Sequence, residues 1–195
     1  MPEGLFLFGD DLYDETTSSF LPTGTTEWQP GPSPPGAGIT GACAVAISDS
    51  EFLLIGGRYV PSQVVSYSMV TGQWTQWPSL VHGRALVSCA RVGDTVVVGG
   101  GEGDTSTSVI HLPSKTVTEG GAMTVARGLY FHMAVLGDRL LAVGGDDGVE
   151  YLDSIEEWDS ENQAWRETEM RMSTARYSFG LAVAPVAAVC PDKRV

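Results

Sequence analysis

The segment LLAVGGDDGVEYLDSIEEWDSENQAW, residues 140–165, decides how this chain folds. An apolar run leads into Gly144 and Gly145, a polar loop follows, and a second extended segment carries Trp158, seven residues before Trp165. Short apolar runs that are interrupted by glycine and separated by polar turns are typical of antiparallel strands. The segment therefore predicts three strands, joined first by a glycine corner and then by a turn.

The same order occurs twice more upstream. The segment FLLIGGRYVPSQVVSYSMVTGQW, residues 52–74, has a Gly-Gly pair after an apolar run and two aromatic residues seven apart, and VVVGGG, residues 96–101, supplies a further glycine pair. The second glycine of each pair stands at 57, 101 and 145, a constant spacing of 44 residues. The repeated positions are Gly56, Gly57, Tyr67 and Trp74; Gly100 and Gly101; and Gly144, Gly145, Trp158 and Trp165.

A fixed period of this length is a mark of propellers and other repeat arrays. The order of apolar run, Gly-Gly pair and spaced aromatic pair resembles the kelch repeat over nearly the whole chain, most clearly around Gly57 and Gly145. The resemblance implies an all-β, kelch-type β-propeller of about four four-stranded blades in a single domain over residues 1–195. The expected blades are residues 1–29 plus 177–183, 42–78, 85–119 and 129–168.

The two ends of the chain suggest how the propeller closes. YSFGLAV, residues 177–183, repeats the innermost-strand pattern of YFHMAV, residues 130–135. We therefore expect a C-terminal strand to complete the blade begun by residues 1–29, which would leave no open sheet edge. The alternatives are a segment of a larger, five- to seven-bladed propeller and self-association through the chain ends.

Composition narrows the possible partners. The chain of 195 residues carries a formal net charge of −13, with 24 acidic and 11 basic side chains. Nucleic acids and anionic membrane surfaces require a basic protein surface, so both are excluded as expected partners. No apolar run approaches the length of a membrane span, and the first residues lack the features of a signal peptide. A cytoplasmic location fits these observations.

The three cysteines, Cys43, Cys89 and Cys190, are odd in number and widely spaced. Cys43 and Cys89 each lie in an apolar strand ahead of a glycine pair, where cysteine ordinarily packs as a small hydrophobic residue. We expect that packing role, with a disulfide or a reactive thiol as the alternative.

The sequence contains none of the common catalytic motifs. It has no nucleophile elbow, phosphate-binding glycine loop or zinc-binding helix motif, and His82, His111 and His132 are isolated from other metal-ligating residues. We therefore predict a non-enzymatic protein with no catalytic residue, metal or cofactor. The alternative is a small enzyme of the kelch superfamily that acts on a sugar or another small ligand at the mouth of the channel.

The placement of arginine is the strongest functional signal. Arg84, Arg127 and Arg176 each precede an innermost strand, and Arg58 follows the first glycine pair. In a propeller these loops open toward the same end of the channel, an arrangement similar to that of kelch substrate adaptors, whose arginines bind acidic peptides through paired hydrogen bonds. The alternative is that the repeated arginines cap backbone carbonyls between blades.

These features predict a protein-interaction module or scaffold that displays its loops on one propeller face. The expected partner is a protein, with an acidic segment as the candidate ligand. The predicted contact residues are Arg58, Arg84, Arg127, Arg176, Tyr130 and Tyr177.

Overall fold

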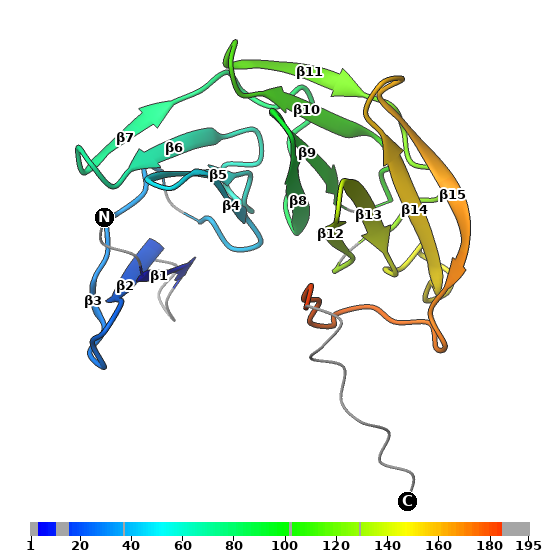
Figure 1. Cartoon of the computed structure of the whole chain (residues 1–195), viewed down its shortest axis with the longest axis horizontal. Helices are drawn as coiled ribbons and strands as arrows, with labels where there is room; N and C mark the ends of the chain where they lie inside the picture. Colours follow the sequence, from blue (N-terminus) through cyan, green and yellow to red (C-terminus); the bar gives the residue numbers. More distant parts are fainter. Residues whose placement is uncertain (1–3, 11–15, 37, 102, 129, 185–195) are drawn as a thin grey trace, which may run out of the picture.

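The computed structural model describes residues 4–10, 16–36, 38–101, 103–128 and 130–184. Four antiparallel sheets follow one another along the chain and are arranged as an arc around a central space (Figure 1). The first sheet contains β1 (Gly4–Asp10), β2 (Thr16–Pro22) and β3 (Gln29–Pro30). The second contains β4 (Cys43–Ser48), β5 (Glu51–Ile55), β6 (Val64–Ser68) and β7 (Gln73–Gln76).

The third and fourth sheets repeat the four-stranded plan of the second. The third contains β8 (Val87–Val92), β9 (Thr95–Gly100), β10 (Thr107–His111) and β11 (Thr116–Gly120). The fourth contains β12 (His132–Leu136), β13 (Arg139–Val143), β14 (Ser154–Asp159) and β15 (Ala164–Arg171). In each of these sheets the first strand lies on the inner side of the arc and the fourth on the outer side (Figure 1). The all-β propeller blades predicted from the repeat are confirmed.

The glycine corners occupy matching places in the second, third and fourth sheets. Gly57, Gly101 and Gly145 have φ values of 124°, 109° and 108°, which side-chain-bearing residues rarely adopt. The N–H groups of Gly57 and Gly101 donate to Arg84 O and Gly128 O, which lie in the loops that lead to the next inner strand. The N–H group of Gly145 donates to Arg176 O, which lies after β15. The repeat in the sequence is therefore a repeat of backbone geometry.

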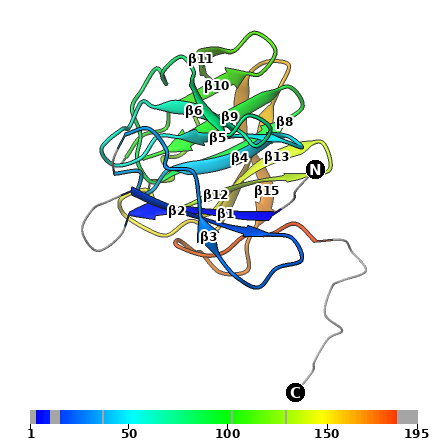
Figure 2. The same cartoon turned by 90° about the vertical axis from the view of Figure 1, so that its left-hand side faces the viewer.

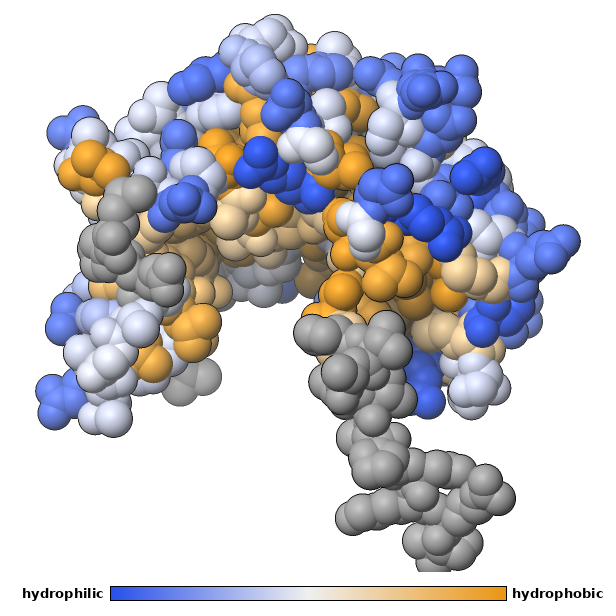
Figure 3. All heavy atoms as spheres, viewed as in Figure 1, coloured by the Kyte–Doolittle hydropathy of each residue, from blue (hydrophilic) through white to orange (hydrophobic). Residues whose placement is uncertain are grey.

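Apolar side chains fill the spaces between neighbouring sheets. Leu53, Val96 and Ile110 belong to the cluster between the second and third sheets, and Val97 and Trp158 to the cluster between the third and fourth. Burial of such apolar surface is the main favourable term in folding. Hydrophilic residues cover the outer rim, whereas hydrophobic residues gather along the concave side of the arc (Figure 3).

The aromatic residues of the repeat serve this packing. Tyr67 and Trp74 face each other across β6 and β7 with ring centroids 5.0 Å apart, and Trp158 and Trp165 do the same across β14 and β15 at 5.3 Å. Phe6 of the first sheet extends the first of these clusters, with its ring 6.2 Å from that of Tyr67. These aromatic side chains thus hold adjacent strands and adjacent sheets together.

The C-terminal closure predicted from the sequence is not seen. Residues 177–183 form no strand, and among the described residues β1 pairs with β2 alone. Instead Ser178 N donates to Tyr130 O, and the Phe179 ring packs edge-on against His132 at 5.1 Å. These contacts hold the segment against the fourth sheet, so the two ends of the arc stay apart (Figure 1). The free edge of β1 lies in the sheet that faces the viewer in Figure 2. A larger propeller and self-association at this edge remain predictions.

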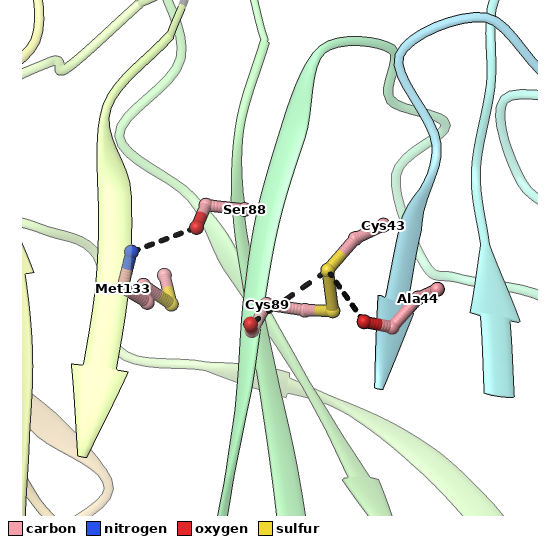
Figure 4. Close-up of a disulfide and its surroundings, with 5 residues drawn as sticks. All are labelled: Cys43, Ala44, Ser88, Cys89 and Met133. Carbon is pink, nitrogen blue, oxygen red and sulfur yellow. Dashed lines mark hydrogen bonds between the residues drawn. A yellow bond between two sulfur atoms is a disulfide. The ribbon is translucent and has the colours of Figure 1, made fainter. Parts of the chain in front are cut away.

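The packing role expected for Cys43 and Cys89 was wrong, and the disulfide given as its alternative is present. Cys43 of β4 and Cys89 of β8 form a disulfide with a Cα–Cα distance of 6.0 Å, although both were expected to be simple packing residues (Figure 4). The neighbouring Ser88 accepts a hydrogen bond from Met133 N of β12 at 2.8 Å. Successive residues of one strand point to opposite faces of the sheet. Cys89 therefore links β8 to β4 on one face, and Ser88 links β8 to β12 on the other.

The disulfide also bears on location. Disulfides persist in oxidising compartments and are rare in a reducing cytosol, whereas a cytoplasmic location was expected from the sequence. The compartment therefore stays a prediction. Cys190 lies outside the described residues. None of the described residues forms a helix that could cross a membrane.

Candidate functional site

The loops at one end of the sheets contain all the residues predicted to bind a partner. These segments connect the second strand of a sheet to its third, connect the last strand of a sheet to the innermost strand of the next, or, for Arg176 and Tyr177, follow β15. Hydrogen bonds join the two kinds of loop, as when Arg58 N donates to Thr40 O and Arg176 N donates to Leu152 O. The repeated arginines differ, however, in the burial of their side chains.

Arg127 is completely buried inside the fourth sheet. Its Nε donates to Glu156 Oε1 at 3.0 Å, its Nη1 to the carbonyls of Gly144 and Ser154 at 2.9 and 3.0 Å, and its Nη2 to Ser154 Oγ at 3.1 Å. Both side chains of the Arg127–Glu156 ion pair have an exposed fraction of 0%. Burial lowers the pKa of Arg127, and the charge of Glu156 and its hydrogen bond oppose that shift.

Arg84 occupies the matching place in the third sheet. Its Nη1 donates to Gly100 O at 3.0 Å and to Asp104 Oδ2 at 3.1 Å, and its Nη2 donates to Ser106 Oγ. The arginine side chain is 1% exposed, whereas that of Asp104 is 41% exposed and lies at the surface end of the pair. Burial lowers the pKa of Arg84, and the neighbouring Asp104 carboxylate opposes the shift.

These contacts change the assignment of two predicted binding residues. Arg84 and Arg127 use their guanidinium groups on backbone carbonyls and on acidic side chains of their own sheets, as the carbonyl-capping alternative expected. The physical reason is that a glycine corner leaves its carbonyl buried, and a buried carbonyl needs a donor. Neither side chain is available to a protein partner in this structure.

Arg58 and Arg176, in contrast, are exposed. The Arg58 guanidinium lies over the Tyr59 ring, 5.8 Å from its centroid, so the two exposed side chains form a cation–π contact. Within the described part of the chain, neither arginine side chain has an acidic partner within ion-pair distance. Of the four predicted cations, these two remain able to meet a ligand.

Tyrosines gather beside Arg176. The rings of Tyr151 and Tyr177 stack with centroids 4.2 Å apart and an interplanar angle of 17°, and both residues are exposed. Tyr130 is exposed as well, and its carbonyl accepts the hydrogen bond from Ser178 N. A hydrogen bond with Tyr177 raises the pKa of Tyr151. Tyr59 and Tyr151 were not predicted from the sequence, although each lies in a loop after a glycine pair.

Acidic residues shape the loop next to these tyrosines. Asp147 Oδ1 accepts hydrogen bonds from the backbone N–H groups of Val149 and Glu150, both at 2.8 Å, and these bonds lower the pKa of Asp147. Asp146 Oδ1 accepts a similar bond from Gly148 N. The carboxylates therefore fix the loop between β13 and β14, and they add negative charge to the loop that carries Tyr151.

The histidines lie apart from one another. His82 Nε2 is 3.6 Å from Glu119 Oε1, His111 Nε2 is 3.1 Å from Thr118 Oγ1, and His132 contacts Phe179. Across the described ranges, no three His, Cys, Asp or Glu side chains are placed to hold a metal ion.

Acid is expected to weaken the Arg84–Asp104 pair. Desolvation raises the pKa of Asp104, but hydrogen bonds from Ser106 and the charge of Arg84 outweigh it, and the net pKa lies below the ordinary value. A carboxylate with a lowered folded-state pKa stabilises the fold above its unfolded pKa, near 4, and this contribution is lost as the pH falls further. Asp104→Asn should therefore show a smaller fall in Tm between about pH 4.5 and pH 2.5 than the wild type. Equal falls in both proteins would contradict this role.

Comparison with known protein families supports the architecture. Residues 127–168, which contain Arg127 and the whole fourth sheet except its last three residues, match the family model described as the kelch motif. No curated protein matches the chain. The matched region contains the glycine corner at Gly144 and Gly145, and the resemblance to kelch repeats predicted from the sequence is thereby confirmed.

Proposed function

Given a kelch-type β-propeller architecture, we propose that this protein is a non-enzymatic interaction module whose loop face binds a segment of a partner protein. The contact surface consists of Arg58, Tyr59, Tyr130, Tyr151, Arg176 and Tyr177, hereafter the tyrosine–arginine face. Kelch repeats ordinarily form interaction modules, and propeller loops are the variable part of the fold.

The observation that carries this proposal is the exposure of four tyrosine rings in the loops of an acidic chain. Tyr59, Tyr130, Tyr151 and Tyr177 are 59%, 43%, 51% and 42% exposed. Tyrosine is enriched in protein interfaces because its ring provides apolar contact area and its hydroxyl a hydrogen bond. Arginine beside tyrosine is the combination most often found at the residues that dominate binding.

The ligand proposed for this surface brings a carboxylate to Arg58 or Arg176 and an apolar side chain to the tyrosines. The acidic-segment hypothesis now rests on these two cations, since Arg84 and Arg127 are buried. Asp146 and Asp147 belong to the loop that carries Tyr151, whose ring stacks on that of Tyr177, the chain neighbour of Arg176. We therefore expect a ligand with one or two carboxylates in place of a long acidic run, because a long run would be repelled here.

Removal of the two exposed cations is expected to abolish partner capture without unfolding the protein. The combined variant Arg58→Met and Arg176→Met should recover at least about tenfold less of each specific partner than the wild type, since truncation of a central interface arginine typically costs 1–2 kcal/mol or more. The measurement is affinity capture with the immobilised chain, followed by quantitative mass spectrometry.

The matched control is Arg166→Met, which removes an exposed arginine from β15 on the outer rim, away from the loops. This control should capture the same partners as the wild type, and all variants should unfold at nearly the wild-type temperature. Undiminished capture by the Arg58 and Arg176 variant would refute the tyrosine–arginine face as the binding surface.

A further inference from the structure

Two contacts of the buried arginines are the same in the third and fourth sheets. Arg84 Nη1 donates to Gly100 O as Arg127 Nη1 donates to Gly144 O, and the Nη2 atoms donate to Ser106 Oγ and Ser154 Oγ. The two arginine environments can therefore be compared position by position along β10 and β14.

The environments differ two residues beyond the serines. In the fourth sheet this position is Glu156, whose Oε1 accepts from Arg127 Nε at 3.0 Å and whose Oε2 accepts from Thr124 N at 2.7 Å. In the third sheet the matching residue is Ser108, because residues two apart on a strand share a face. Glu156 binds Arg127 Nε through its carboxylate, whereas Ser108 has no carboxylate with which to bind Arg84 Nε.

The consequence is a pair of buried polar atoms with no hydrogen-bond partner in the described residues. These atoms are Arg84 Nε and Ser108 Oγ, and Ser108 is 0% exposed. A buried donor without an acceptor costs free energy comparable to a lost hydrogen bond. Asp104 does not remove this cost, because it binds Arg84 through Nη1.

The chemistry of the missing group identifies the ligand. Serine Oγ takes the place of the γ-carbon of glutamate, so the part of Glu156 that Ser108 lacks is one planar carboxylate of three heavy atoms. We propose that the third sheet binds a small monocarboxylate of the size of formate between Arg84 Nε and Ser108 Oγ. The carboxylate accepts from both donors, and its bond with Arg84 Nε corresponds to the bond of the Glu156 carboxylate with Arg127 Nε in the fourth sheet.

A pocket at the loop face borders Arg84. It has a volume of about 330 Å³ and is lined by residues 83–86, by the Gly100–Gly101 corner and by Asp104. Ser108 does not line this pocket, so the proposed ligand enters from the arginine side. The proposal is independent of protein binding at the tyrosine–arginine face, which uses other side chains.

Thermal unfolding in sodium formate, against sodium chloride at equal ionic strength, tests the proposal. The wild type should show a saturable formate-dependent rise in Tm, about 3–5 °C at a tenfold excess over the dissociation constant. Ser108→Glu supplies the carboxylate covalently. It is expected to unfold at a higher temperature than the wild type without formate and to show no formate-dependent rise.

Glu156→Ser provides a second, independent measurement. This variant reproduces the third-sheet arrangement in the fourth sheet, so its Tm should fall below that of the wild type. Formate should restore part of the lost Tm. If Ser108→Glu fails to fold, this rescue by formate tests the proposal in its place. The proposal is overturned if formate stabilises the wild type no more than chloride does, the result expected if a buried water satisfies both donors. An equal formate response in Ser108→Glu and the wild type would overturn it too.

Discussion

Replacement of Arg127 by methionine is expected to lower the free energy of unfolding by about 3–5 kcal/mol, the usual cost of breaking a buried ion pair. The variant leaves the Glu156 carboxylate buried with one remaining donor, Thr124 N, and leaves the carbonyls of Gly144 and Ser154 without their arginine donor. A buried charge without a partner is far more costly than a buried apolar side chain. Chemical denaturation followed by tryptophan fluorescence measures the change, since Trp158 and Trp165 lie in the same sheet.

The double variant Arg127→Met and Glu156→Met separates the charge effect from the loss of packing. It should be less destabilised than Arg127→Met alone, because both charges are removed together. A double variant that loses the sum of the two single losses would show that Glu156 and Arg127 do not act as a pair. The exposed-arginine control, Arg166→Met, should keep a Tm close to that of the wild type.

Loss of the Cys43–Cys89 disulfide is expected to have a comparable effect. The bond closes a loop with a sequence separation of 46 residues. On the chain-entropy model, a loop of that length contributes about 4 kcal/mol by restricting the unfolded chain. The variant Cys43→Ser and Cys89→Ser, compared with the oxidised wild type, should therefore show a loss of roughly 2–4 kcal/mol in the free energy of unfolding.

The thiol content of the purified protein provides the control for this experiment. Titration of the denatured, unreduced chain should find one free thiol, that of Cys190, among its three cysteines. Three free thiols in protein purified under oxidising conditions, or an equal stability with and without reductant, would contradict a disulfide between β4 and β8.

The repeat could be predicted from the sequence because the residues that recur in it have few other structural roles. Glycines at positive φ and tryptophans seven residues apart leave little freedom, so Gly57, Gly101 and Gly145 identified the corners of three sheets. The C-terminal segment misled the closure prediction because its apolar pattern does not specify which sheet it joins. Contacts with Tyr130 and His132 keep it on the fourth sheet.

The directions of the arginine side chains could not be predicted from the sequence. Their positions before the inner strands were predicted, but the direction of a long flexible side chain cannot be deduced from position alone. A signal was present in the polar residues at the start of β10 and in β14, because Ser106, just before β10, and Ser154 and Glu156 of β14 stand where a buried arginine needs acceptors. Arg176 has the same position in the repeat and an exposed side chain. The disulfide was missed although its cysteines lie close to one repeat apart, a spacing that places them on adjacent inner strands.

The central claim is that one repeat position has two roles, with Arg127 building a sheet and Arg176 meeting a partner. The most direct test measures unfolding and partner capture side by side for Arg127→Met and Arg176→Met. We expect Arg127→Met to lose much of its stability, and Arg176→Met to keep its stability while it loses partner capture. A destabilised Arg176→Met together with a fully stable Arg127→Met would contradict the claim.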